Sequence, residues 1–332
     1  REDATLLPFN RKIFVLNPKQ VNKFKEAYND LPKNDSVDSF VIADCLRFGR
    51  INKEVYIGDY RYKALQNLTR ARYFAVCNLV KEKQRFMNVL FKKYSTMTQE
   101  KVFSDTFSTT ALAVYDEFES AEALANMDLH ELTAFIMERG KNRFPDPDSV
   151  AKAIQKAARS SYRLPKTVND SVNQVLSISI TSMKALESQI KEFDKAIAAQ
   201  MKLLPNVLTS IPGIGPVYAA GIMAEIGDIN RFENHAQLAK YAGLAWTQYQ
   251  SGGFEAQTTR LIRSGNRFLK YYLCEAAFSL VRCDKEYSDF YHLKYKEVNR
   301  YQHKRALALT ARKLVRLVFA LLKDNRLYRL AK

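Results

Sequence analysis

Apolar residues recur at alternating spacings of four and three between residues 166 and 204, and this stripe constrains the fold more than any other feature. Its members are Val172, Leu176, Ser179, Met183, Leu186, Ile190, Phe193, Ile197, Met201 and Leu204. A repeat of 3.5 residues places one continuous edge along a helix and is typical of coiled-coil pairing. A helix packed inside its own domain gives a similar stripe. The partner is either the helix expected at 60–94 or another subunit.

The chain before this stripe divides into two kinds of pattern. The β-branched and aromatic run Ile13–Leu16, closed by Asn17-Pro18, predicts a buried strand. Short helices are predicted at 20–28 and from Asp35 to about Gly49. One strand followed by short helices indicates the end of an α/β domain, whereas the glycine- and proline-free segment 60–94 predicts one continuous basic helix.

Net charge limits the partners that the chain can have. Lysine and arginine number 52 against 35 acidic residues, giving a formal charge of +17. Such self-repulsion is tolerated most readily when the partner is a polyanion, and interleaved tyrosine and phenylalanine favour nucleic acid over an acidic membrane or a merely well-solvated surface. No apolar run has transmembrane length, and we expect no signal peptide. Four scattered cysteines and four histidines give zinc or disulfide frameworks little support, so we expect a reducing cytoplasm.

The phrase Ile211-Pro-Gly-Ile-Gly-Pro216 is typical of a helix-hairpin-helix element. Glycines let a backbone approach closely, and the N–H groups that open the next helix can face a phosphate. We therefore expect Gly213, Ile214 and Gly215 to bind a DNA backbone without reading its sequence. An ordinary tight turn between two helices is the alternative.

A serine in the polar phrase Gln250-Ser-Gly-Gly253 is a candidate nucleophile. Ser251 alone would be a linker residue, but cations follow it on an expected strand-to-helix passage. These residues, with one asparagine among them, are Arg260, Arg263, Asn266, Arg267 and Lys270. Fixed guanidinium groups stabilise the charge that a phosphodiester gains under attack, and nearby cations favour the alkoxide of a serine.

Asp35 and Asp38 are candidate metal ligands. Three residues apart on a helix, their carboxylates lie on one face and can share a Mg²⁺ ion. Ordinary capping of a helix N-terminus explains the same two residues.

Several phrases of the C-terminal part resemble the bridge-RNA-guided serine transposases (recombinases) of insertion-sequence family one hundred and ten. The phrases are Ile211–Pro216, Ala224–Ile229 with Arg231-Phe232, Leu238–Leu244, Gln250–Gly252, Arg263–Asn266 and Ala311–Leu314. They run in order from about Leu204 to Lys323. The N-terminal part is similar to the same family through Val15–Pro18, Lys33–Asp38 and Ala43.

This resemblance implies an organisation and a reaction. It implies the remainder of an RNase H-like, RuvC-like DEDD domain at 1–57, basic helices at 58–165, a coiled-coil helix at 166–204, and a mostly helical serine transposase domain at 205–332. Ser251 would be the covalent nucleophile that forms a 5′-phosphoserine link to DNA, assisted by Mg²⁺ on four carboxylates that end in Asp35 and Asp38. The implied partners are target DNA, donor DNA and a structured guide (bridge) RNA. The implied assembly is a tetramer, a dimer of dimers, at the prokaryotic nucleoid.

The chain departs from the family's pattern at three places. The first two metal acids should lie on strands upstream of Val15, and Glu2 and Asp3 are too close to Asn17 to be assigned. Because the chain opens on Arg1, we expect that a segment carrying these acids is missing. Asn34 replaces the usual threonine, and Ala245-Trp246 interrupts a Gly-Leu-x-Pro phrase.

The residues and the resemblance together predict a DNA transposase, and the resemblance implies that it is guided by RNA. A non-catalytic helix-hairpin-helix protein that binds branched DNA or structured RNA explains the charge and the glycine-rich turn without needing Ser251. A tyrosine recombinase using Tyr287 or Tyr291 is a weaker alternative, because no Arg…His-x-x-Arg set is evident.

Overall fold

A computed structural model describes most of the chain. The described residues are 9, 14–16, 18–28, 31–49, 59–100, 102–247, 250, 251, 254, 255 and 260–329. They form two compact units, residues 1–59 and 60–332. Helices dominate both units, and the described strands are the short pair β1 (Gln250–Ser251) and β2 (Phe254–Glu255).

The first unit is built from two helices, α2 (Pro18–Lys25) and α3 (Asp35–Arg47). Asn34 caps α3 by accepting a hydrogen bond from the Val37 N–H at 2.8 Å, which accounts for the predicted helix start. The expected strand is not present at 14–16, where the backbone takes no regular structure and Val15 is 75% exposed. A strand needs a neighbouring strand to pair with, and the described part of this unit offers none. Ile13 and Asn17 lie outside the described residues.

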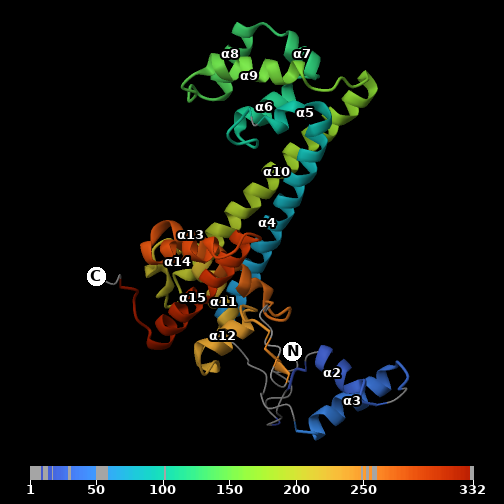
Figure 1. Cartoon of the computed structure of the whole chain (residues 1–332). Helices are drawn as coiled ribbons and strands as arrows, with labels where there is room; N and C mark the ends of the chain where they lie inside the picture. Colours follow the sequence, from blue (N-terminus) through green and yellow to red (C-terminus); the bar gives the residue numbers. More distant parts are fainter. Residues whose placement is uncertain are drawn as a thin grey trace. The chain divides into compact units, whose positions relative to one another are not determined.

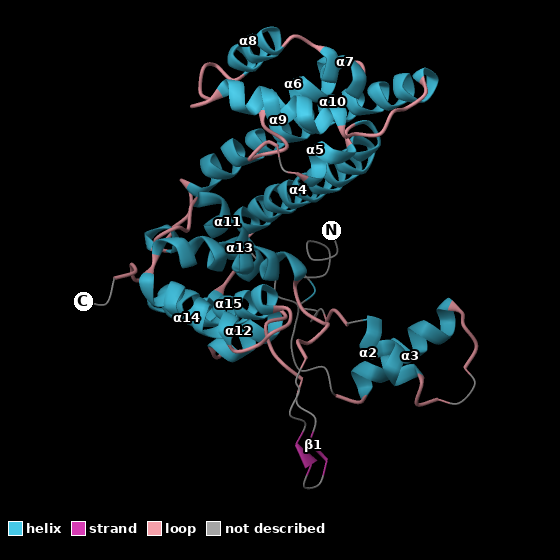
Figure 2. Ribbon diagram, turned by 45° about the horizontal axis from the view of Figure 1, so that its top comes forward, coloured by secondary structure: helices cyan, strands magenta, loops and turns pink. Residues whose placement is uncertain are grey.

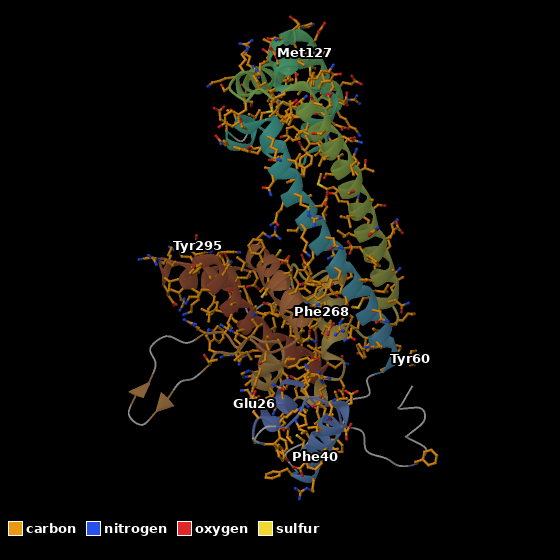
Figure 3. All side chains as sticks on the ribbon, turned by 90° about the vertical axis from the view of Figure 1, so that its right-hand side faces the viewer. Glu26, Phe40, Tyr60, Met127, Phe268 and Tyr295 are labelled. Carbon is orange, nitrogen blue, oxygen red and sulfur yellow. The ribbon has the colours of Figure 1, made fainter. Side chains whose placement is uncertain are left out.

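Two long helices, α4 (Tyr60–Lys93) and α10 (Lys166–Met201), form the axis of the second unit. They run antiparallel and side by side (Figures 1 and 3). Lys83 pairs with Glu187 at 3.4 Å, and the Ser179 hydroxyl donates to Glu82 at 2.7 Å. Of the two partners that the sequence left open for the apolar stripe, the helix of the same chain is the one in contact.

Each end of this helix pair carries a bundle. The tip bundle, residues 95–159 with the adjoining parts of α4 and α10, contains α5 (Ser95–Gln99), α6 (Thr109–Glu117), α7 (Ala121–Asn126), α8 (Leu129–Arg139) and α9 (Pro147–Arg159). The base bundle, residues 204–324, contains η2 (Leu208–Ser210), α11 (Pro216–Ile226), η3 (Ile229–Arg231), α12 (His235–Tyr241), α13 (Arg267–Cys283), α14 (Lys285–Lys296) and α15 (Gln302–Asp324). Figure 3 labels Met127 in the first and Phe268 in the second.

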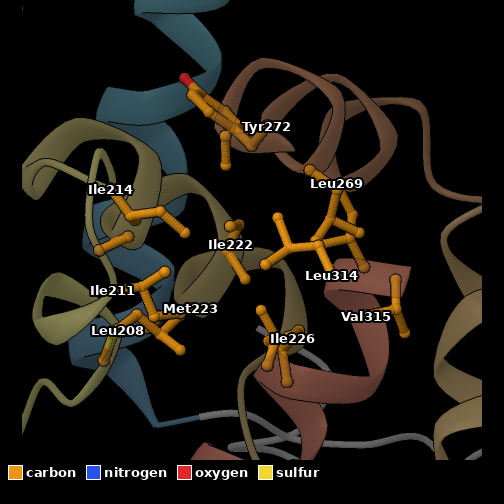
Figure 4. Close-up of a cluster of buried hydrophobic side chains, with 14 of the residues drawn as sticks. Leu208, Ile211, Ile214, Ile222, Met223, Ile226, Leu269, Tyr272, Leu314 and Val315 are labelled. Atoms are coloured by element: carbon orange, nitrogen blue, oxygen red, sulfur yellow. The ribbon is translucent and has the colours of Figure 1, made fainter. Parts of the chain in front are cut away.

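The core of the base bundle forms where α11, α13 and α15 meet (Figure 4). Ile222 on α11, Leu269 on α13 and Leu314 on α15 are fully or almost fully buried there. Gly221 is needed at the contact with α13, because a Cβ atom on it would lie 2.3 Å from the ring of Tyr272. Close packing of this kind holds the loops between these helices in fixed positions.

Among the described residues, no helix combines the length and the apolar character that crossing a membrane requires.

Candidate functional site

The two candidate metal ligands lie at the start of α3. Asp35 is its first residue and is exposed, and Asp38 follows one turn later. Asp38 Oδ1 accepts a hydrogen bond from Lys25 Nζ at 2.6 Å, an ion pair that ties α2 to α3. Across the described residues, no three His, Cys, Asp or Glu side chains gather closely enough to hold a metal ion. The pair therefore offers two oxygen ligands, one of them already held by a lysine.

A third acid of the same helix serves the packing of the unit. Asp44 is buried and accepts hydrogen bonds from the Tyr28 hydroxyl and from Arg47 Nε, the latter at 2.7 Å. These two bonds, that from Tyr28 first, lower the pKa of the Asp44 carboxyl. Asp44 is thereby held as a carboxylate on α3, where it binds Tyr28 from the segment that follows α2.

Ser251 is the last residue of β1, which pairs antiparallel with β2 (strands in magenta in Figure 2). Ser251 pairs with Phe254 and Gln250 with Glu255, so β1 and β2 form a short antiparallel hairpin. The sequence predicts a polar loop here, and the structure adds the pairing of β1 with β2 within it. The side chain of Ser251, and residues 248, 249, 252, 253 and 256–259, lie outside the described part.

The base of this hairpin is closed by a second antiparallel pairing. Trp246 and Leu261 form an isolated bridge. The Thr247 N–H donates to the Arg260 carbonyl at 2.8 Å, and the Ile262 N–H donates to the Ala245 carbonyl at 2.9 Å. The segment that carries Ser251 therefore leaves and re-enters the base bundle at one point, directly before α13.

Three arginines follow this closure. Arg260, Arg263 and Arg267 are all exposed, and no described carboxylate pairs with them. Arg267 stacks on Phe268 and Phe74, with its guanidinium carbon 4.7 and 5.5 Å from the ring centroids. Stacking limits the positions of the guanidinium group and leaves its N–H donors available.

Asn266 lies among these arginines in the sequence, but its side chain is bonded to other parts of the protein. Its side-chain oxygen caps α13 by accepting from the Phe268 and Leu269 N–H groups at 3.0 Å each. Its amide nitrogen donates to Glu225 at 2.6 Å and to the Tyr241 hydroxyl at 3.2 Å. These bonds use both the oxygen and the amide nitrogen of the side chain. Asn266 therefore holds the start of α13, and its predicted role in positioning a phosphate stays a prediction.

Glu225 is a residue that the sequence reasoning missed. It is 2% exposed, and Arg70 of α4 donates two hydrogen bonds to its carboxylate, from Nε at 2.7 Å and from Nη2 at 2.9 Å. Gln66 adds a donor at 3.2 Å. The available signal was one acid in the otherwise apolar run of α11, since a buried carboxylate requires partners. This network fixes α4, α11 and the start of α13 to one another.

The glycine-rich turn before α11 is only partly open to a ligand. Gly213 has φ +80°, and a Cβ atom on it would lie 2.9 Å from Cys283 Sγ, so packing on α13 already requires a glycine. Ile214 is buried, and its N–H donates to the Ile211 carbonyl at 3.0 Å. Gly215 is the exposed N-cap of α11, with open space around it and no side-chain cap. The element before this turn is the three-residue η2, shorter than the helix that the motif predicts.

Several cations of α4 have partners inside the protein. Arg70 pairs with Glu225, Arg72 with Asp194 and Lys83 with Glu187. Lys93 is buried in the tip bundle. The expected basic surface of this helix is thus partly a set of ion pairs that hold α4 to its neighbours.

The two tyrosines of the alternative recombinase mechanism are buried. Tyr287 is 4% exposed and Tyr291 is 8% exposed, and the Tyr291 hydroxyl shares a hydrogen bond with His303 Nδ1 at 2.7 Å. Burial raises the pKa of Tyr287. Neither hydroxyl is placed to reach a DNA phosphate, so the geometry does not support this mechanism.

Comparison with known proteins gives matches at both ends of the chain. Residues 206–292 match the model of the Transposase IS116/IS110/IS902 family. Residues 4–94 match a second family model, DEDD_Tnp_IS110, described as a transposase. The first range contains the Ser251 hairpin, and the second contains Asp35 and Asp38.

Individual relatives come from bacterial insertion elements. An uncharacterized 44.8 kDa protein of insertion element IS116 from Streptomyces clavuligerus is 27% identical over 98% of this chain and 80% of that protein. An uncharacterized 42 kDa protein of IS900 from Mycobacterium paratuberculosis is 24% identical over the same shares. The transposase for insertion sequence element IS1111A of Coxiella burnetii is 29% identical over 48% of this chain and 44% of that protein.

Proposed function

We propose that this chain, an insertion-sequence transposase of the IS110/IS116 family, cuts and rejoins DNA through a covalent bond to Ser251. The observation that carries the proposal is the closed hairpin: Ser251 ends the strand β1, and exposed arginines without a described acidic partner lie at the base of the hairpin and directly after it. A nucleophile has to reach a bulky DNA strand, and a hairpin end is reachable. Arginines that lack acidic partners are free to bind phosphate.

The proposed step transfers a phosphoryl group from a DNA strand to the protein. The Ser251 hydroxyl oxygen forms a bond to phosphorus, the bond from phosphorus to the 3′-oxygen breaks, and the leaving oxygen takes up a proton while the serine proton is lost to solvent. The 5′-phosphate end stays on the serine. Attack by a different 3′-hydroxyl reverses the step and rejoins the DNA. Arg260, Arg263 and Arg267 stabilise the charge on the non-bridging oxygens, and Asn266 positions their segment.

Asp35 and Asp38 would contribute two oxygen ligands to a divalent ion, with Mg²⁺ as the proposed metal. Carboxylates one helical turn apart suit this hard cation, and Lys25 shows that Asp38 already attracts a positive charge. When bound, Mg²⁺ would polarise a phosphoryl oxygen. The chain's own contribution is to hold the two acids at the capped start of α3. The family's RuvC-like domain remains a proposal for residues 1–57.

Target DNA, donor DNA and a structured guide RNA are the proposed partners, and a tetramer is the proposed assembly. The net charge of +17 supports polyanion binding. Gly215 and the first turn of α11 support contact with a phosphate, because no side chain caps that helix. Gly213 and Ile214 hold this turn against α13.

A plasmid that carries the gene's own insertion element with its flanking DNA tests the proposal. Ser251→Ala should abolish strand exchange in cells and leave DNA binding intact. Ser264→Ala is the matched control, because Ser264 is an exposed serine of the same basic segment. Strand exchange by Ser251→Ala at the level of the control would mean that a residue other than Ser251 is the nucleophile.

A further inference from the structure

Three basic side chains of the base bundle meet where α12 lies beside α15 (Figures 1 and 2). Arg312 and Arg316 stand one turn apart on the same face of α15, and Arg312 Nη1 lies 3.4 Å from Nδ1 of His235, the first residue of α12. Arg316 is exposed, and the other two are half-buried. Together these residues form the α12–α15 cluster.

The charges of this cluster are not balanced by acids. No described carboxylate pairs with Arg312 or Arg316. Burial first, and then the charge of Arg316, lowers the pKa of Arg312. Burial, followed by the charges of Arg312 and Arg316, lowers the pKa of His235, against a weaker opposing hydrogen bond from its own backbone. The cluster therefore holds two like charges beside a neutral imidazole.

Nearby acids are engaged elsewhere. Glu233, two residues before His235, is exposed and accepts from the Gln237 side chain at 2.6 Å. Glu286 of α14 pairs with Lys313 at 2.7 Å, on another face of α15. Other cations of α15 have partners too, namely Arg305 with Glu297, and Lys323 with Asn230. Arg312 and Arg316 thus differ from Arg305 and Lys313 of the same helix, each of which has a carboxylate partner.

We propose that the α12–α15 cluster binds the phosphodiester backbone of a nucleic acid. Two guanidinium groups on successive turns, with an imidazole beside one of them, provide forked N–H donors for phosphate oxygens. A bound phosphate relieves the repulsion between the two arginines, and the net charge of +17 favours a long polyanion over an isolated acidic group. The site extends the proposed nucleic-acid function but does not depend on Ser251.

Salt dependence of binding tests the site directly. Purified full-length Ser251→Ala protein is titrated with a labelled DNA duplex and with an RNA duplex of the same sequence. Replacing Arg312 and Arg316 by glutamine should reduce the slope of log affinity against log salt by about 2, since each lost phosphate contact removes roughly one counterion. A change with DNA alone identifies DNA as the occupant, and a change with RNA alone identifies RNA.

The matched control removes the same charge with the same helical spacing. Lys152→Gln with Lys156→Gln on α9 changes two exposed lysines four residues apart in the tip bundle. An equal loss of slope in this control, or no loss in the arginine variant with either duplex, overturns the site. The covalent mechanism would stand in that case, because its adduct is measured separately.

A second readout reports on the cluster itself. The four histidines of the chain can be assigned by NMR, with His235→Asn identifying the signal of interest. Binding of the duplex that shows the salt effect should raise the pKa of His235, because the phosphate offsets the charges of Arg312 and Arg316. The arginine variant should lose this response. An unchanged His235 titration at saturating duplex contradicts the proposal.

Discussion

The tip bundle and the base bundle both bury charged side chains, and Lys93 of the tip and Glu225 of the base are satisfied in opposite ways. Lys93 in the tip is 1% exposed and donates to the backbone carbonyls of Tyr115, at 2.9 Å, and Phe118. Both acceptors lie at the end of α6, within 25 residues of the lysine. Lys93 thus ties the end of α4 to the end of α6, which lies close to it in the sequence.

Glu225 in the base instead joins parts that are far apart in the chain. Its donors Arg70 and Asn266 are 155 and 41 residues away. They come from α4 and from the start of α13, the helix that follows the arginine segment. A buried charge with distant side-chain partners specifies how elements are arranged, whereas one held by nearby carbonyls secures a single turn. We therefore infer that Glu225 holds the start of α13, and with it the proposed active segment, in position against α4.

The largest expected effect is that of Glu225→Ala. This change leaves the half-buried Arg70 without its acceptor and removes a partner of Asn266, so the unfolding free energy should fall by about 2–3 kcal/mol. Urea unfolding followed by circular dichroism measures it. Glu192→Ala is the control, because Glu192 makes only an exposed ion pair with Lys195 on α10 and should matter little. Similar losses for the two variants would remove the special role of Glu225.

A pH effect is expected from the tip. Burial lowers the pKa of Lys93 to about 8, below its ordinary value, so the unfolded chain binds the proton more tightly. Stability should therefore rise with pH through this range, by about 2 kcal/mol between pH 7 and 9.5. Burial also raises the pKa of Tyr94 and Tyr115, and their titration opposes the gain at higher pH. The unfolding free energies of the wild type and of Lys93→Met are measured against pH, and that of the variant should not show the rise. Parallel curves of unfolding free energy against pH would show that Lys93 keeps its ordinary pKa.

The smallest effect concerns a helix cap in the tip. Ser120 caps α7 by accepting from the Ala123 N–H at 3.0 Å, so Ser120→Ala should reduce stability by about 1 kcal/mol. Ser120→Asp keeps an acceptor and should retain stability. Hydrogen exchange in the first turn of α7 locates the change. Faster exchange at α13 instead would mean that a change in the tip bundle is transmitted to the base bundle, against the local role given to the contacts of the tip.

The long helices could be predicted from sequence because their signals are local. α4 begins at the predicted Tyr60, and α10 lies within the predicted 166–204 segment, since the apolar period and the absence of glycine and proline are contained in each segment. The two short helices of the first unit were also confirmed. The strand expected at 13–16 was not found at 14–16, because a strand depends on a neighbour that no local pattern supplies.

The candidate site was predictable only in its residue types. The sequence brought Ser251 and the arginines into one segment, but the pairing of Trp246 with Leu261 is a tertiary feature. The role of Asn266 could not be read because its partner Glu225 lies 41 residues upstream. In the sequence, a buried network appears only as a charged residue within an apolar segment, and the sequence does not show which residues bind it.

Identification of the residue bonded to DNA tests the central claim most directly. The element-bearing plasmid is incubated with the protein and the guide RNA, the adduct that survives denaturation is digested with protease and nuclease, and the peptide is sequenced by mass spectrometry. The account predicts a nucleotide phosphate on Ser251 and no adduct from Ser251→Ala. A nucleotide on any other residue, or an adduct that persists in Ser251→Ala, would contradict it.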